Sequence, residues 1–236
     1  MNPMQSMFPT RNPLKQVRLS AALLLAGAVV LLTGFVLHPE ETPDATDQVA
    51  IIGAHADAWA LAHWVLLAGG LLFGAGCAIL ARARYGPSRF PGGRRAFIAL
   101  TLSAVLALEI FAVEATLAVQ AGRDGDVSAY EGLLVPEIPG IIGLLGLGLA
   151  GAWAFVTQAR DDCPVLPKAV NYVIAAFAVL GFVGTVAFAL GNTALANLQY
   201  GTAVFLLGIV AFAVKALVES RPHHRDGGAT AKPRMG

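Results

Sequence analysis

Long apolar stretches and short polar segments alternate along the whole chain. Each apolar stretch has about the 20 residues that a helix needs to cross the hydrocarbon core of a bilayer. The six stretches cover residues 19–37, 58–81, 96–121, 138–157, 169–190 and 200–218. Within them the apolar positions are continuous and do not alternate, which favours helices over the strands of a barrel. The pattern therefore predicts an all-α, polytopic membrane protein with six transmembrane helices.

Composition supports a lipid environment. Hydrophobic residues make up 56% of the 236 residues and charged residues only 13%, against about 25% charged residues in a typical soluble domain. The first apolar run is longer than the roughly 7–15 residues of a signal peptide core. It is followed by His38-Pro39-Glu40-Glu41 and not by a small-residue cleavage site. We therefore expect a retained first helix, and the lipid bilayer as the main partner.

The basic residues predict the orientation. In a six-helix arrangement, all 16 Lys and Arg residues except Arg123 fall on one side of the membrane. Since Lys and Arg are retained in the cytoplasm, both termini are predicted to be cytoplasmic, in the plasma (inner) membrane of a prokaryote. Residues 19–218 then form the transmembrane domain, between disordered cytoplasmic tails at 1–18 and 219–236. Nothing in the sequence combines basic and aromatic residues as a nucleic-acid surface would.

Two carboxylic acids lie inside the third apolar run. Glu109 is expected near the middle of the membrane, and Glu114 roughly 7–8 Å closer to the outer side at 1.5 Å per residue. Charged groups at such depth are costly and usually functional. A separation of five residues turns the two side chains about 140° apart on a helix. The two carboxyl groups are therefore not expected to pair unaided.

Histidines are concentrated near the outer side of the same half of the chain. His55, Trp59 and His63 share one stripe if this segment is a continuous helix, and His63 lies at a depth similar to that of Glu114. His38 closes the first apolar run at the same boundary. His38, His55, His63 and Glu114 are therefore expected to converge, together with Asp57 and Glu137. The aromatic residues near this boundary are predicted to anchor the helices at the interface; they are Trp59, Trp64, Tyr130 and Tyr200.

Three interpretations of these residues are open. His63 and Glu114 could form a structural hydrogen bond between helices. Alternatively, His38, His55, His63 and Glu114 could ligate haem or a transition metal, since imidazole and carboxylate suit several first-row metals. Finally, Glu109, Glu114 and His63 could line a path for protons or a small solute. The cofactor is thus unknown, with haem or a metal as the candidates.

A short pattern in the first half resembles a group of small multi-pass bacterial and archaeal membrane proteins. It consists of Leu37-His38-Pro39 at the end of the first apolar run, followed by His55-x3-Trp59-x3-His63. The resemblance implies that the outer histidines act as a unit, and it carries no assigned chemistry.

Nucleotide-binding loops and metalloprotease motifs such as HExxH are absent from the sequence. The leading hypothesis is a small-solute or proton-coupled transporter that uses Glu109, Glu114 and His63, because a metal site near the outer face would not explain Glu109 near the middle of the membrane. The alternatives are a haem- or metal-binding redox protein and a structural subunit of a membrane complex. Partners within such a complex, or further copies of the chain, are expected in the membrane, and the sequence does not decide whether the chain is an enzyme.

Overall fold

The computed structural model describes residues 13–83, 86–162 and 164–220, and all the regular structure in this part of the chain is helical. Six of its helices are long and apolar enough to cross a membrane. This confirms the all-α, six-helix prediction.

The six spans and their connections follow one another in a simple order. The spans are α1 (Pro13–Leu37), α3 (Ala56–Ala83), α4 (Pro91–Val113) with its continuation, α7 (Leu134–Ala159), α8 (Lys168–Ala189) and α10 (Gly201–Glu219). The third span continues through the π-helix η3 (Glu114–Ala118) into α5 (Val119–Asp124). The shorter elements are α2 (Ala45–Ala54), α6 (Val127–Glu131), α9 (Thr193–Ala196) and the 3-10 helices η2 (Gly86–Arg89) and η4 (Asn197–Tyr200).

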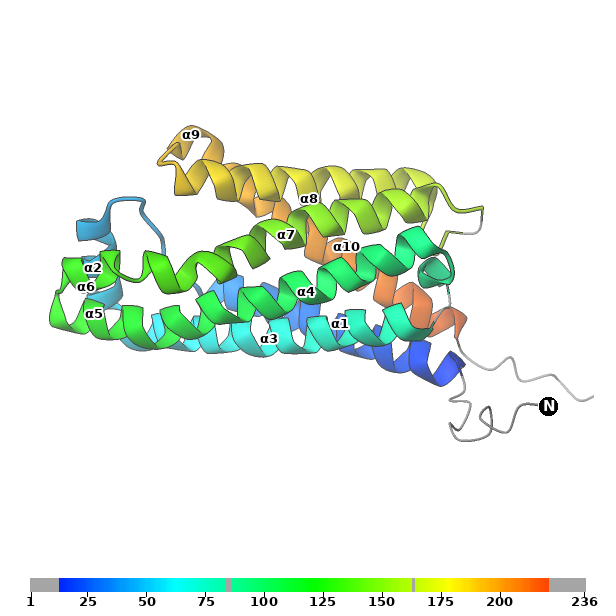
Figure 1. Ribbon diagram of the computed structural model, residues 1–236, viewed down its shortest axis with the longest axis horizontal. Helices are drawn as coiled ribbons and strands as arrows, with labels where there is room; N and C mark the ends of the chain where they lie inside the picture. The colour runs from blue at the N-terminus through cyan, green and yellow to red at the C-terminus, as the bar shows by residue number, and fades with distance from the viewer. Residues whose placement is uncertain (1–12, 84–85, 163, 221–236) are drawn as a thin grey trace, which may run out of the picture.

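The spans run roughly side by side along the long axis of the molecule (Figure 1), and their contacts form a closed ring. Each packs against the next in the order α1, α3, α4, α7, α8, α10, and α10 returns to pack against α1. The side chain of Arg18 in α1 donates from Nε to the carbonyl oxygen of Ser220, just after α10, at 2.8 Å. The two ends of the described chain therefore lie at the same end of the bundle, as an even number of spans requires.

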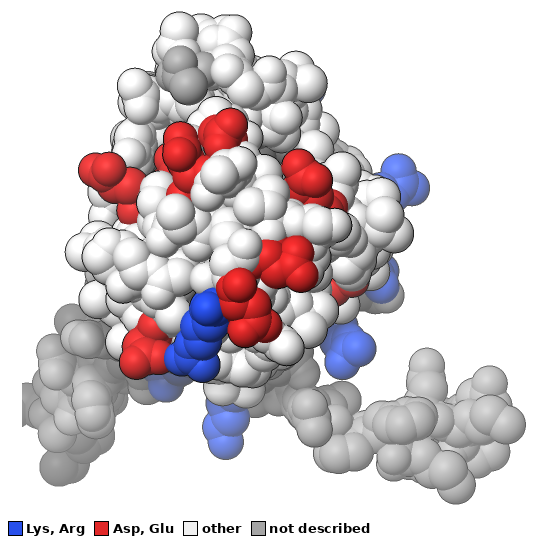
Figure 2. Space-filling view, turned by 90° about the vertical axis from the view of Figure 1, so that its left-hand side faces the viewer, with Lys and Arg blue, Asp and Glu red and all other residues white. Residues whose placement is uncertain are grey.

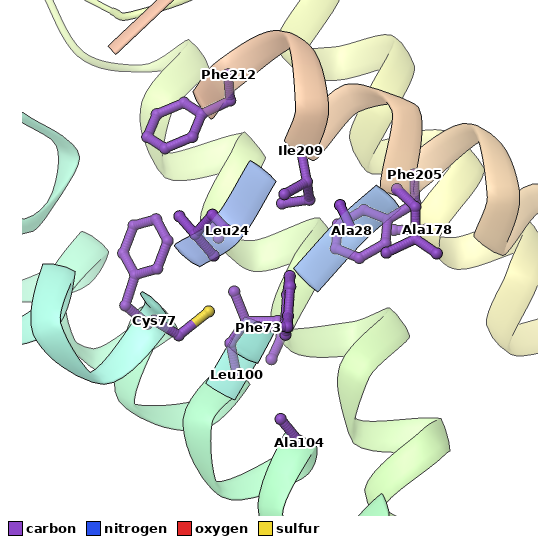
Figure 3. Packing of buried hydrophobic residues seen from close by; sticks show 14 of the residues in the cluster. Leu24, Ala28, Phe73, Cys77, Leu100, Ala104, Ala178, Phe205, Ile209 and Phe212 are labelled. Atoms are coloured by element: carbon purple, nitrogen blue, oxygen red, sulfur yellow. The ribbon is translucent and has the colours of Figure 1, made fainter. Parts of the chain in front are cut away.

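The apolar residues divide between the interior and the outer surface of the bundle. Figure 3 shows part of the interior, where residues from α1, α3, α4, α8 and α10 meet, among them Leu24, Phe73 and Phe205. Other large apolar side chains point outward; Leu71, Leu102 and Leu149 are 52%, 60% and 52% exposed. An apolar exterior of this kind fits a lipid environment.

Charge separates the two ends of the bundle, here called the acidic end and the basic end. At the acidic end lie the α1–α3 connection with α2, and the segment from α5 to α6. Asp and Glu gather on this face (Figure 2). The acidic residues there include Asp44, Asp47, Asp124, Asp126 and Glu131. The opposite end carries Arg18, Arg89, Arg160 and Lys168. The charge distribution agrees with the sequence pattern, and the assignment of the basic end to the cytoplasm stays a prediction.

Short helices cover the acidic end. Asp44 caps α2 by accepting from the backbone N–H of Asp47, and Asp126 caps α6 in the same way from Ala129. Helix α2 packs directly on α5: a Cβ added at Gly53 would lie 2.5 Å from the carbonyl oxygen of Gly122. This close contact holds the α2 segment over the ends of α3 and the third span.

The ends of the spans differ slightly from the sequence estimates. Helix α1 begins at Pro13, inside the segment 1–18 that was predicted to be a disordered tail. Proline suits the first turn of a helix because its missing N–H has no partner there. Residues 1–12 and 221–236, which make up most of the predicted tails, lie outside the described residues.

Candidate functional site

Polar side chains from three segments meet just inside the acidic end. Trp59 and His63 belong to α3, Glu114 begins the π-helix, and His38 follows α1 directly. Trp59, His63 and Glu114 are 1%, 5% and 9% exposed. Burial of this many polar groups in an apolar bundle is costly unless each has a partner, and the hydrogen bonds of the site account for most of them.

His38 and His63 face one another. Their Nε2 atoms are 3.2 Å apart and their ring centroids 4.6 Å apart. The other ring nitrogen of each histidine contacts a backbone carbonyl oxygen: Nδ1 of His38 is 2.8 Å from Pro39, and Nδ1 of His63 is 3.0 Å from Trp59. A carbonyl oxygen can only accept, so both Nδ1 atoms carry the hydrogen. The two Nε2 atoms therefore face each other at hydrogen-bonding distance, where they share either a proton or another cation.

Trp59 connects the histidines to the carboxyl groups. Its indole N–H donates to Oε2 of Glu114 at 3.0 Å, while its backbone carbonyl accepts from His63. The structure thus places Trp59 between His63 and Glu114, where the sequence suggested a direct hydrogen bond. The interface-anchor prediction is wrong for Trp59, which is 1% exposed, whereas Trp64 and Tyr200 are 49% and 68% exposed.

Glu114 has a second carboxyl group beside it. Glu137, in the first turn of α7, lies within hydrogen-bonding range of Glu114. Two carboxylates offer no donor, so a bond between them requires the pair to hold a proton. Among the described residues, the buried Oε1 of Glu137 has no hydrogen-bond partner. Glu114 also opens a π-helical turn, and such widened turns often mark functional sites.

Glu109 contacts α7 from α4. Its Oε2 accepts from the backbone N–H of Gly140 at 3.1 Å, and its charge is close enough to affect Glu137. A Cβ at Gly140 would lie 2.5 Å from Cβ of Ile110, so only glycine permits this approach of α7 to α4. Glu109 and Glu114 have no direct hydrogen bond, as expected, but Glu137 from the neighbouring helix interacts with both of them.

His55 and Asp57 do not join this cluster. His55 caps the end of α2, with φ −125° and ψ 27°, and is exposed. The stripe of His55, Trp59 and His63 assumed a single helix, and the break between α2 and α3 interrupts it. The Asp57 side chain is 95% exposed and pairs with Arg123 at 2.6 Å. Within the described residues, no three His, Cys, Asp or Glu side chains form a ready-made metal-binding group.

Two groups outside the spans complete the site. Oε1 of Glu41 is 3.4 Å from Nε2 of His38. The Glu41 side chain is 37% exposed, and partial desolvation by its neighbours raises its pKa, although His38 opposes the rise. Burial and the charges of Glu114, Glu137 and Glu41 also raise the pKa of Tyr130, so its hydroxyl stays protonated. Sequence reasoning missed Glu41 and did not place Tyr130 in the site, because both come from segments that it treated as loops or interface.

The fold and this site define a multi-pass membrane protein with a buried cluster of titratable side chains near one end. Comparisons with protein-family models, curated proteins and solved structures find no match. The chemistry must therefore be argued from the site itself.

Proposed function

We propose that the chain is a proton-linked membrane transport protein in which Glu114, Glu137 and Glu109 form the proton path. The supporting observation is the gathering of three carboxyl groups where the third span meets α7: Glu114 is buried, Glu109 and Glu137 are partly buried, and Glu137 interacts with both of the others. A purely structural clamp needs only a donor and an acceptor. It gives no reason for a third acid with a buried, unpartnered oxygen.

The path begins at the acidic end. Glu41, with a side chain that is 37% exposed, and Tyr130 interact with the Glu114 and Glu137 pair at this end. A cleft on this end of the molecule is lined by Gln120, Asp124 and Asp126 among others, and neither Glu114 nor Glu109 belongs to its lining. Protons can pass between neighbouring carboxyl groups without a water-filled channel. The site therefore fits proton movement better than the passage of a large solute in this conformation.

Glu109 is the last member of the series of carboxyl groups. Toward the basic end, the next buried residues of α4 are Ala107, Ala104, Ser103 and Leu100, and the single hydroxyl of Ser103 does not extend the series of carboxyl groups to the basic end. Onward passage therefore needs a second conformation. The α4–α7 contact is suited to one because Gly140, Gly143 and Gly146 give α7 a smooth face against α4. Small sliding movements of packed helices commonly change which side of a protein a buried group can exchange protons with.

Proton flux into proteoliposomes tests this proposal. Vesicles that contain a pH-sensitive dye would receive a pH gradient together with a potassium diffusion potential. Wild-type protein is expected to carry protons faster than empty vesicles, and Glu137→Gln and Glu109→Gln are expected to abolish the difference. Glu131→Gln is the matched control because Glu131 is exposed at the end of α6. Wild-type flux no faster than that of empty vesicles would contradict the proposal and favour a structural role.

A further inference from the structure

The pair His38 and His63 has a geometry that the proton path does not explain. Both imidazoles donate from Nδ1 to backbone carbonyls, so their Nε2 atoms are left to each other and to Glu41. Two neutral Nε2 acceptors held 3.2 Å apart repel each other, so the pair must share a cation: a proton, which makes the contact a hydrogen bond, or a metal ion that replaces the proton. Metal-ligating histidines characteristically donate their second ring nitrogen to a carbonyl or carboxylate oxygen, which fixes the ring and makes the free nitrogen a better ligand.

From this arrangement we infer that His38, His63 and Glu41 form a binding site for one divalent first-row transition metal ion of the zinc or copper class. The inference does not depend on the proposed proton path. Imidazole nitrogen and carboxylate oxygen together suit these ions. The site is new relative to the sequence hypothesis, since Glu41 takes the place of His55 and Glu114.

The spacing of the nitrogen atoms fits a compact ion. Two nitrogens bound tetrahedrally at about 2.0–2.1 Å from zinc lie roughly 3.3 Å apart, close to the 3.2 Å between the two Nε2 atoms. On opposite faces of a haem they would be roughly 4 Å apart with the macrocycle between them. The Trp59 ring packs against both imidazoles, with centroids 4.5 Å and 5.2 Å away, and occupies the space beside the pair. The geometry therefore favours an ion over haem.

Glu41 supplies the third ligand by a small movement. Its Oε1 is 3.4 Å from Nε2 of His38, and its side chain is 37% exposed, which leaves room for rotation. The backbone after it is held in place, because the Thr42 N–H donates to the buried Gln48 side chain at 2.7 Å. This need for a rotation is consistent with the absence of a preformed three-residue group among the described residues. A water molecule would complete four-coordination and leave one position open.

Metal retention tests the inference. The full chain, purified in detergent, would be incubated with zinc sulfate, dialysed and analysed for zinc, and the coordination would be examined by the visible spectrum of the cobalt(II) form. The chain has five histidines, and His223→Ala with His224→Ala removes the two that lie outside the described residues. In this background we expect about one zinc ion per chain and a tetrahedral or five-coordinate cobalt spectrum.

Single substitutions identify the ligands. We expect zinc binding to weaken at least ~10-fold in each of three variants: His63→Ala, His38→Gln and Glu41→Gln. A loss of that size is the smallest seen even for residues that only hydrogen-bond to a metal ligand. His55→Ala should have no effect, because His55 is exposed and outside the cluster. Glu137→Gln should keep the zinc while it abolishes proton flux, so the two proposals fail independently.

Three results would overturn the inference. They are wild-type protein without retained zinc, equal loss of zinc in His55→Ala, and full retention in His38→Gln. Because His63→Ala removes a buried side chain, its unfolding temperature would be measured without metal. His38 and Glu41 lie outside the spans, so their substitution should disturb folding less. If His63→Ala fails to fold, zinc retention by His38→Gln and Glu41→Gln decides whether the metal site exists.

Discussion

The indole N–H of Trp59 donates to Oε2 of Glu114 at 3.0 Å, across the interface between α3 and the third span. Both side chains are buried, so neither has water as an alternative partner. This bond links the two parts of the site, because the backbone carbonyl of the same residue accepts from His63.

Replacing the indole tests the strength of this link. Trp59→Phe keeps an aromatic ring but removes the donor, which leaves the carboxyl group of Glu114 buried without it. We expect the free energy of unfolding in detergent to fall by about 1–3 kcal/mol. Trp64→Phe on the same helix, where Trp64 is 49% exposed, should change it by less than about 0.5 kcal/mol. Equal effects of the two substitutions would show that the hydrogen bond contributes nothing specific.

Close approach of α7 to α4 depends on glycine. A methyl group at position 140 would lie 2.6 Å from the backbone nitrogen of Ile110, so Gly140→Ala must push the helices apart and pull the Gly140 N–H away from Glu109. We expect a loss of about 1–3 kcal/mol in stability, together with loss of proton flux. Gly92→Ala is the matched control, since its nearest neighbour would be 3.6 Å away. Unchanged stability of Gly140→Ala would contradict the tight α4–α7 contact.

Two ion pairs at opposite ends of the bundle should contribute different amounts to the free energy of unfolding. Arg89 and Asp161 are 2.6 Å apart at the basic end, and the Asp161 side chain is only 6% exposed. Arg89→Leu leaves a largely buried carboxylate without this partner. We expect the free energy of unfolding to fall by about 1–3 kcal/mol, which is less than for a fully buried pair because Arg89 itself is 43% exposed. Arg123→Leu breaks the exposed pair with Asp57 and should cost less than about 1 kcal/mol. Thermal unfolding of both variants in the same detergent makes the comparison, and the reverse order would refute it.

Labelling tests the predicted orientation. In a chain with Cys77 and Cys163 replaced by serine, Ser128→Cys places a thiol at the acidic end and Asp162→Cys places one at the basic end. If the basic end faces the cytoplasm, a membrane-impermeant thiol reagent should modify Ser128→Cys in intact cells. Asp162→Cys should react only after the membrane is permeabilised. The opposite pattern would reverse the orientation while leaving the helix count intact.

The sequence predicted the spans well because length and hydropathy determine them locally. It also placed His63 and Glu114 at matching depth, since depth follows from position along a helix. It did not predict the role of Trp59 or the link through Glu137. These contacts depend on how neighbouring helices are rotated, which in this bundle is decided by contacts such as that of Gly140 with Ile110. His55 was misplaced because the rule for residues four apart holds only within one helix.

Contact between α1 and α10 has a consequence for how the protein is made. Leu24 and Ala28 of α1 are 1% and 0% exposed, and they lie in the same cluster as Phe205 and Ile209 of α10. During synthesis, α1 leaves the ribosome first and α3 can pack on it early, but its face toward α10 stays open until the sixth span is inserted. The ring therefore closes last at the seam between its first and sixth spans. A nascent chain stopped before α10 would expose that seam to lipid and to the quality-control proteases of the membrane.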